Sequence, residues 1–315
     1  MLENMMPVAY RVAVLFLVMG AGFLAAKARW LNADGAKQMT SIVFYLATPC
    51  VIINSFLSVD VSPELMGNIL KTAGFAFILH LFAILLSRIA IRKESRERLA
   101  IYRMCVTFSN CGYMGVPLAS GILGEESVVY VSVYIAVFNL FVWTYGISLY
   151  RPGEKLTVKN MLLNPGVLSL GTGLLLAGLF ALNPQWSFPP LLGEPMELLA
   201  SLNSPLAMIV LGYHLSVSPL RPRAGEGKLW LALALKLLAV PAAALGVSVL
   251  LGLRGMWLSA ALVLTTTPCA TNVVLFAARF EGDAPHAAKV VSLCTLLSLV
   301  TIPFFLGLSM AVNPL

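Results

Sequence analysis

Long apolar stretches alternate with short polar connections along the whole chain. A helix needs about 20 mainly apolar residues to cross a bilayer, and ten stretches approach this length. They fall at about 8–26, 39–57, 70–90, 99–121, 127–149, 165–182, 196–215, 229–251, 256–278 and 287–308. The connections between them are too short and too apolar for a separate soluble domain. The pattern predicts an all-α membrane protein with ten transmembrane helices.

Composition supports lipid as the solvent of this chain. Hydrophobic residues make up 59% of the 315 positions and charged residues 11%, with a mean hydropathy of +0.88. A water-soluble core of ordinary proportions cannot hide so much apolar surface. The chain starts with MLENMMPVAYR, which has an acidic residue and no cationic lead. The first stretch is therefore predicted to be a retained span and not a cleaved signal peptide.

The net charge of +7 has two explanations, nucleic-acid binding or membrane orientation. With the N-terminus outside, the inward connections hold all of the 21 basic residues except Arg11, Lys71 and Arg254, which face outward, and Lys236, which lies within a span. Cytoplasmic loops of membrane proteins carry this excess of Lys and Arg. We therefore expect both termini outside the cytoplasm and no nucleic-acid partner.

A weak internal repeat sets the expected architecture. AGFL at 21–24 recurs as AGLF at 177–180, and LATPC at 46–50 recurs as LNSPL at 202–206, both at an offset of 156. The stretch from Asn110 to Gly124 matches the stretch from Pro268 to Gly282 at an offset of 158. Five spans in each half force the second copy to enter the membrane from the opposite side. We expect two inverted five-helix repeats, residues 1–155 and 156–315.

The fourth and ninth spans are predicted to be broken helices. They read TFSNCGYMGVPLASG from Thr107 to Gly121 and TTTPCATNVVLFA from Thr265 to Ala277. Proline removes a helical hydrogen bond, and glycine weakens the helix further. In hydrocarbon, a freed backbone group costs several kcal/mol unless a partner satisfies it. Corresponding interrupted helices of inverted repeats meet near the membrane midplane, where substrates bind.

Unwinding at both places would leave two half-helix N-termini, each carrying about half a positive charge, suited to a carboxylate. Asparagine amides and nearby hydroxyls add hydrogen-bonding groups. This arrangement favours an anion site without a basic side chain. The candidate substrate-binding residues are Ser109, Asn110, Gly112, Pro117, Thr267, Pro268, Thr271 and Asn272.

For any single residue of this kind, a packing kink between membrane helices is the more common explanation. The matched positions in the two halves favour a site instead. Thr48-Pro49 and Ser204-Pro205 form a second matched pair, for which hinges and packing kinks are equally plausible. Asn54 and Asn203 are candidate neighbours of the site.

The segments FSNCGYMGVPL, TTTPCATNVVLFA and LLSLVTIPF resemble the auxin efflux carrier family, which includes plant PIN carriers and bacterial permeases assigned to malate or malonate. The resemblance covers essentially the whole chain and implies a fold similar to that of bile-acid sodium symporters. It implies a scaffold and homodimer-forming domain of helices 1, 2, 6 and 7. Helices 3–5 and 8–10 would form a transport domain containing crossing broken helices 4 and 9, which moves as an elevator.

This chain lacks the long loop between the halves that many plant members have, because only the short segment 156–163 joins them. It therefore resembles the compact bacterial type, which implies a bacterial inner membrane. A dicarboxylate or another small organic acid is then a more plausible substrate than a plant hormone.

No Asp or Glu lies at a predicted midplane, so a carboxylate relay for H+ or Na+ is not evident. We consider His80, Lys236, Asn139 and Thr295 as candidates for proton or ion coupling. The stem of Lys236 could also extend to the membrane interface, and His214 is expected to be structural. We expect no cofactor. The five cysteines show no CxxC spacing, so neither disulfides nor a metal site are expected.

Three other function classes compete with a carrier. An intramembrane enzyme would need a catalytic set such as HExxH, paired midplane aspartates or a Ser/Lys dyad, and the sequence contains none. A channel would need a continuous polar pore or rings of charge. A sensor that binds without flux is the alternative that the sequence excludes least well. Among carriers, a sodium-coupled organic-anion symporter is the alternative.

Overall fold

The computed structural model describes residues 2–151, 163–183, 185–218, 220, 226–280 and 282–313. Within these ranges the chain forms helices and connecting segments, with one isolated pair of bridged residues. The expected boundary between the two repeats, at residues 155 and 156, lies outside them. So do four of the basic residues used to predict orientation: Lys155, Lys159, Arg221 and Arg223.

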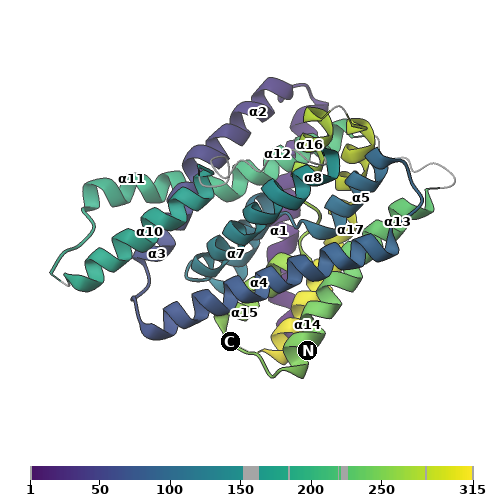
Figure 1. Ribbon diagram of the computed structural model, residues 1–315. Helices are drawn as coiled ribbons and strands as arrows, with labels where there is room; N and C mark the ends of the chain where they lie inside the picture. The colour runs from purple at the N-terminus through teal and green to yellow at the C-terminus, as the bar shows by residue number, and fades with distance from the viewer. Residues whose placement is uncertain are drawn as a thin grey trace.

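The helices follow one another along the chain with only short connections (Figure 1). The α-helices are α1 (Leu2–Lys27), α2 (Ala33–Ile42), α3 (Thr48–Leu57), α4 (Pro63–Ala90), α5 (Arg96–Thr107), α6 (Val116–Leu123), α7 (Ser127–Phe141), α8 (Ile147–Tyr150), α10 (Pro165–Leu182), α11 (Pro190–Ser201), α12 (Asn203–Val217), α13 (Gly227–Ala234), α14 (Val240–Leu250), α15 (Met256–Thr266), α16 (Asn272–Arg279) and α17 (Ala284–Val312). Four π-helical turns continue or join them: η1 (Val43–Ala47), η2 (Cys111–Gly115), η3 (Val142–Gly146) and η4 (Leu235–Ala239).

Eight helical segments of the described chain are long and apolar enough to cross a membrane. They are Ala9–Lys27, Ala33–Leu57, Pro63–Ala90, Ser127–Tyr150, Pro165–Leu182, Pro190–Val217, Gly227–Leu250 and Ala284–Val312. Each matches one of the ten predicted spans, so these eight predictions are confirmed. The other two, the fourth and ninth, each consist of two shorter helices separated by non-helical residues, as their sequences predict.

Three of the four π-helical turns come directly before a proline at the second position of the next helix: Pro49, Pro117 and Pro241. Proline has no N–H, and its ring clashes with the carbonyl four residues earlier. A π-helical turn widens the helix by one residue, so that the residue before the proline bonds five residues back. Val240 N–H, for example, bonds to the Leu235 carbonyl. The chain thus stays helical through these prolines.

Helices α1 and α12 pack closely along their lengths because glycines face each other. A Cβ on Gly22 would lie 2.3 Å from the Ile209 carbonyl oxygen, and one on Gly212 would lie 2.0 Å from the Met19 carbonyl oxygen. Helix α3 packs against α10 and α11, where Gly173 accommodates the ring of Phe56. Small residues allow this close approach between membrane helices.

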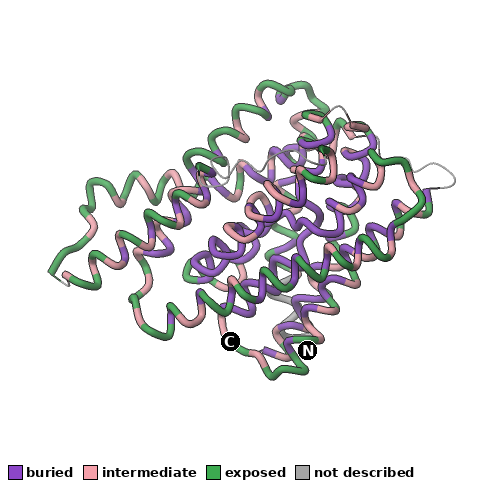
Figure 2. The backbone as a smooth tube through the Cα atoms, viewed as in Figure 1, coloured by how far each residue is buried: buried purple, intermediate pink, exposed green. Residues whose placement is uncertain are grey.

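The most buried helices occupy the centre of the molecule (Figure 2). Nearly all of α7 and α15 is enclosed, together with the end of α5 and much of α17. Helices α10 and α11 present many exposed apolar side chains, as a lipid-facing surface does. Both broken spans therefore lie in the enclosed centre.

Candidate functional site

The two broken spans meet at their non-helical residues. Helix α5 ends at Thr107 and α15 ends at Thr266, and beyond each end the chain becomes extended. Asn110 N–H donates to the Pro268 carbonyl oxygen and Ala270 N–H donates to the Phe108 carbonyl oxygen, each over 2.8 Å. We call residues 108–110 and 268–270 the crossing segments. Their pairing satisfies backbone groups that would otherwise be unpaired in the membrane.

Helical structure resumes immediately beyond both crossing segments. The π-helical turn η2 begins at Cys111 and leads into α6, while α16 begins at Asn272. Met114 N–H and Gly115 N–H both donate to the Asn110 carbonyl oxygen. Two helix N-termini with their partial positive charges therefore start next to the pairing. Pro117 is buried in the first turn of α6.

The predicted substrate-binding residues differ in how they are placed. Asn110 is 3% exposed, and its side-chain Nδ2 has no hydrogen-bond partner among the described residues. Thr267 is also buried, but its hydroxyl donates to the Leu264 carbonyl oxygen over 2.8 Å. Thr271 and Asn272 are partly exposed. Of these four, Asn110 presents a buried donor that a ligand could use.

Glycine positions shape the space beside the crossing segments. A Cβ on Gly112 would meet no atom within 4 Å, so open space lies on that side of η2. A Cβ on Gly115 would lie 2.3 Å from the Leu264 side chain of α15. Gly115 thus permits the close approach of the two broken spans, whereas Gly112 borders unfilled space.

Lys236 is completely buried, and its ammonium donates a hydrogen bond to the hydroxyl of Ser109 in the first crossing segment. The interpretation that its stem extends to the membrane interface is wrong. The sequence also favoured a site without a basic side chain and showed no Ser/Lys dyad, and the contact between Lys236 and Ser109 contradicts both expectations. Helix α13 passes through η4 at this point, and that turn carries Lys236 toward the crossing segments. Among the described residues, no carboxylate forms an ion pair with it.

His80 lies in an aromatic environment beside the first crossing segment. Its ring stacks on Phe141 at a centroid distance of 5.1 Å and contacts Phe108 at 6.1 Å. Nδ1 lies 2.7 Å from the Ala76 carbonyl oxygen, so it carries the proton and donates. Nε2 is buried without a partner among the described residues. The residue is therefore enclosed close to the candidate site.

The other candidates for ion coupling have helical or interhelical partners. The Thr295 hydroxyl donates to the Val291 carbonyl oxygen within α17 over 2.9 Å. The side-chain amides of Asn139 and Asn164 face each other with N–O distances of 3.4 Å. Asn164 also caps α10. These contacts are of the kind that pack helices together. His214, on α12, is exposed.

The second matched pair of X-Pro segments also meets. The Thr48 hydroxyl donates to Asn203 Oδ1 over 2.8 Å, linking the start of α3 to the start of α12. Asn203 is 1% exposed, and its Nδ2 has no partner among the described residues. Asn54 is half-buried one and a half turns further along α3. Corresponding segments of the two halves are thus in contact at both pairs.

Sequence reasoning missed a buried ionic cluster at the start of α13 and α17. Lys289 Nζ lies 2.9 Å from Glu226 Oε1, and His286 Nδ1 lies 3.8 Å from the same oxygen. The other ring nitrogen of His286 lies 2.8 Å from the hydroxyl of Tyr102 on α5. Lys289 looked like a residue of an inward connection. The His286 to Lys289 spacing of three, which places both on one helix face, was the available signal.

Comparison with known proteins finds a transporter family and relatives that are named as transporters. A family of membrane transport proteins matches residues 7–162 and 154–306. An uncharacterized transporter of Methanocaldococcus jannaschii is 27% identical over 95% of this chain and 97% of its own length. A Rhizobium meliloti protein whose name proposes it as a malonate transporter is 25% identical over 89% of each chain.

A plant protein is also similar to this chain. Protein PIN-LIKES 1 of Arabidopsis thaliana is 26% identical over 59% of this chain and 39% of its own length. The family match spans nearly all of the chain and includes both crossing segments. The chain therefore belongs to the membrane transport protein family, the auxin efflux carrier family that its motifs resemble.

Proposed function

We propose that this protein is a secondary transporter that carries a small organic anion, a carboxylate or dicarboxylate such as malonate or malate, bound at the crossing segments. One observation carries the proposal: Lys236 is wholly buried beside Ser109 without a carboxylate partner among the described residues. A buried ammonium without a counter-ion is costly. A substrate carboxylate would supply the missing negative charge.

The surrounding groups suit the same ligand. Asn110 Nδ2 is a buried donor without a partner among the described residues, and two helix N-termini begin at Cys111 and Asn272. Hydrogen bonds from charged or oriented donors to a carboxylate are among the stronger ones in proteins. A dicarboxylate could place one carboxylate at Lys236 and the other toward a helix N-terminus. The name of the Rhizobium meliloti relative supports malonate as the first substrate to test.

Alternating access requires movement, because Ser109, Asn110 and Lys236 are 3% exposed or less. Two packing groups suit such a movement. Helices α1, α3, α10, α11 and α12 form one connected group, and α4, α5, α7, α15, α16 and α17 form another. The two groups meet where α1 packs on α17 and where α3 and α10 pack on α7. We assign the first group, with α2, to a scaffold and the second, with α6, α8, α13 and α14, to a transport domain that moves as an elevator.

The inverted repeat is part of this proposal. An inverted pair of five-helix repeats brings corresponding elements together at its pseudo-two-fold axis. Ser109 pairs with Cys269, and Thr48 bonds to Asn203, so both matched pairs of interruptions are in contact as this symmetry requires. Each broken span then crosses the membrane as one unit, which completes ten spans.

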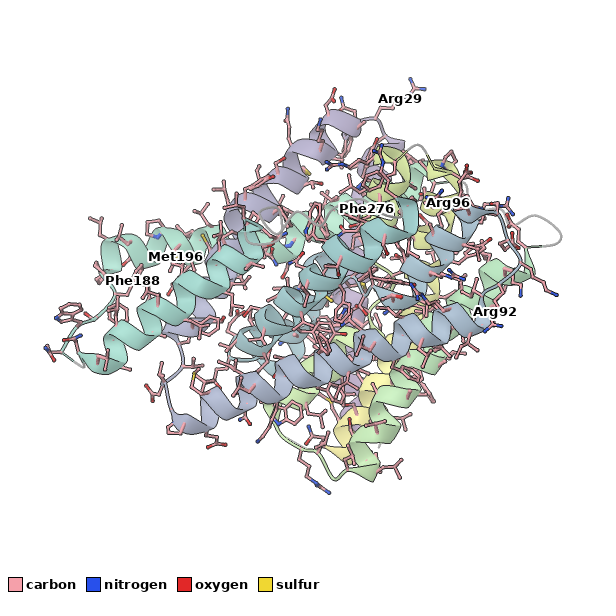
Figure 3. The ribbon with its side chains drawn as sticks, viewed as in Figure 1. Arg29, Arg92, Arg96, Phe188, Met196 and Phe276 are labelled. Atoms are coloured by element: carbon pink, nitrogen blue, oxygen red, sulfur yellow. The ribbon has the colours of Figure 1, made fainter. Side chains whose placement is uncertain are left out.

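We further propose that the scaffold forms a homodimer in a bacterial inner membrane with both termini outside. Exposed apolar residues on α10 and α11, among them Leu175, Leu191 and Leu198, offer a surface for this contact. Figure 3 shows Arg29, Arg92 and Arg96 toward one end of the molecule, away from Phe188 and Met196. The end with the arginines is the cytoplasmic end in this orientation.

Uptake into liposomes tests the function. Proteoliposomes are expected to accumulate radiolabelled malonate saturably, and inward H+ and Na+ gradients imposed separately identify the coupling ion. Repulsion from the Lys236 ammonium disfavours Na+ at Ser109, so the proton gradient is expected to be the more effective. Tight binding without flux would indicate a sensor, and neither flux nor binding for a panel of organic acids would contradict the proposal.

Substitutions at two glycines of η2 distinguish residues that border the substrate from residues that pack the two broken spans together. Gly112→Ala places a methyl group in open space, so we expect a folded protein with malonate affinity weakened about tenfold by the narrower site. Gly115→Ala forces a contact with Leu264, and overpacking costs about 1–3 kcal/mol, so its melting temperature should fall. Equal effects of both substitutions on affinity and melting temperature would contradict this assignment.

A further inference from the structure

Three cysteines from distant parts of the sequence come together beside the crossing segments. Cys105 lies on α5, Cys269 is in the second crossing segment and Cys294 is on α17. Their Sγ atoms all lie within 4.8 Å of one another, and all three side chains are fully buried. Cys269 N–H donates to Cys294 Sγ over 3.2 Å. The absence of CxxC spacing therefore did not mean that the cysteines lie apart.

The spacing suits a trigonal thiolate site. With metal–sulfur bonds of about 2.3 Å, three sulfurs in a plane around an ion lie about 4.0 Å apart. The cluster needs only small side-chain adjustments from its present limit of 4.8 Å. Thiolates prefer soft ions such as Cu(I), whereas a structural Zn(II) site takes four ligands. No fourth His, Cys, Asp or Glu joins the group among the described residues.

The positive charge beside the cluster favours deprotonated sulfur ligands. Lys236 bonds to Ser109, which pairs directly with Cys269, so an ammonium lies close to the three sulfurs. Binding of Cu(I) replaces thiol S–H bonds by Cu–S bonds and releases the protons to solvent. Replacement of all three S–H bonds leaves a cluster charge of −2, and the +1 charge of the nearby Lys236 offsets half of it in this enclosed environment.

We propose that Cys105, Cys269 and Cys294 form a Cu(I)-binding site that joins α5, the second crossing segment and α17. The inference does not depend on the transport proposal, because it concerns binding of the metal alone. If the crossing segments do carry substrate, a bound ion would hold three of the surrounding chain segments together and slow transport. A chelator should then restore the rate.

The test is a titration of the reduced, detergent-purified full chain with Cu(I) in competition with a chromophoric Cu(I) chelator. The wild type is expected to hold one Cu(I) per chain. Cys105→Ser, Cys269→Ser and Cys294→Ser should each weaken binding at least about 100-fold. Cys50→Ser and Cys111→Ser, which alter cysteines outside the cluster, serve as matched controls and should bind as the wild type does.

X-ray absorption at the copper edge examines the site without any substitution. The proposal predicts three sulfur neighbours at about 2.3 Å. Loss of Cu(I) from the wild type to the chelator, nitrogen or oxygen neighbours in the spectrum, or equal binding by all five serine variants would overturn it. Normal malonate uptake by a protein that binds no Cu(I) would contradict this site and leave the transport proposal intact.

Discussion

Lys236→Met is expected to weaken malonate binding at least about 100-fold and to abolish uptake. Loss of one partner from a buried ion pair costs about 3–5 kcal/mol, and each 1.4 kcal/mol corresponds to about a factor of ten. Methionine keeps the length and apolar stem of the side chain while removing the ammonium that contacts Ser109. Isothermal titration of the purified protein with malonate measures the change.

The same substitution is expected to raise the melting temperature of the substrate-free protein. A buried cation without a carboxylate partner costs free energy, and a well-packed methionine removes that cost. Lys71→Met, which alters an exposed lysine of α4, is the matched control and should leave both measurements unchanged. A Lys236→Met protein that is less stable but binds malonate normally would show that the lysine serves only the fold.

Asn110→Asp is expected to weaken malonate binding at least about 100-fold, whereas Asn110→Ala weakens it about tenfold. Alanine removes one donor to a charged ligand, worth about 1.5–3 kcal/mol. Aspartate has nearly the same shape but adds a negative charge next to Ser109, where it repels the anion and competes for Lys236. The fold should survive both changes, because Asn110 pairs with Pro268 through its backbone.

Asn272, at the start of α16, allows the effect of Asn110→Ala to be compared with the same change beside the second crossing segment. Asn272→Ala, at the first position of α16, is expected to reduce affinity less than Asn110→Ala because its side chain is partly exposed. Affinity for malonate and the yield of monodisperse protein are measured for all three variants. Wild-type affinity in Asn110→Asp would remove this residue from the site.

Hydropathy and the positions of prolines were sufficient to predict the helical spans and their two interruptions. The reason is physical: spanning helices must be apolar over about 20 residues, and a proline such as Pro268 interrupts a helix locally. Pro117 lies in the first turn of α6, beyond the break at 108–110, so it indicates the broken span without marking the break itself. The ends were harder, since α4 begins at Pro63 and the prediction began at 70. Caps such as Ser62, and not apolar content, determine where such a helix begins.

The placement of Lys236 could not be read from the sequence. Distance along a helix does not say whether a lysine faces lipid, the interface or the protein interior. Its direction depends on the π-helical turn Leu235–Ala239, and on the pairing that brings Ser109 to the same place. Both are consequences of tertiary structure. A basic residue within an otherwise apolar span nevertheless indicates a functional position.

The ion pair and the cysteine cluster were not predicted because their residues lie far apart in the sequence. Glu226 directly precedes α13 and Lys289 lies in α17, so the two meet only after α13 packs beside α17. Cys105 and Cys269 are likewise brought together by the crossing of the broken spans, and α17 adds Cys294. Spacing motifs detect ligands only when they come from one local segment. The chemistry of this membrane centre is therefore assembled mainly from contacts between residues that lie far apart in the sequence.

We propose that a substrate carboxylate binds at Lys236 and Asn110. Solid-state NMR can measure it directly, as the distance between the carboxylate carbon of 13C-labelled malonate and the 15N-labelled side chain of Lys236 in the protein reconstituted in lipid. The proposed site predicts a dipolar coupling that corresponds to about 3–4 Å, the range of a charged hydrogen-bonded pair. Lys236→Met identifies the signal by removing it. Saturated malonate binding without this coupling would contradict the account.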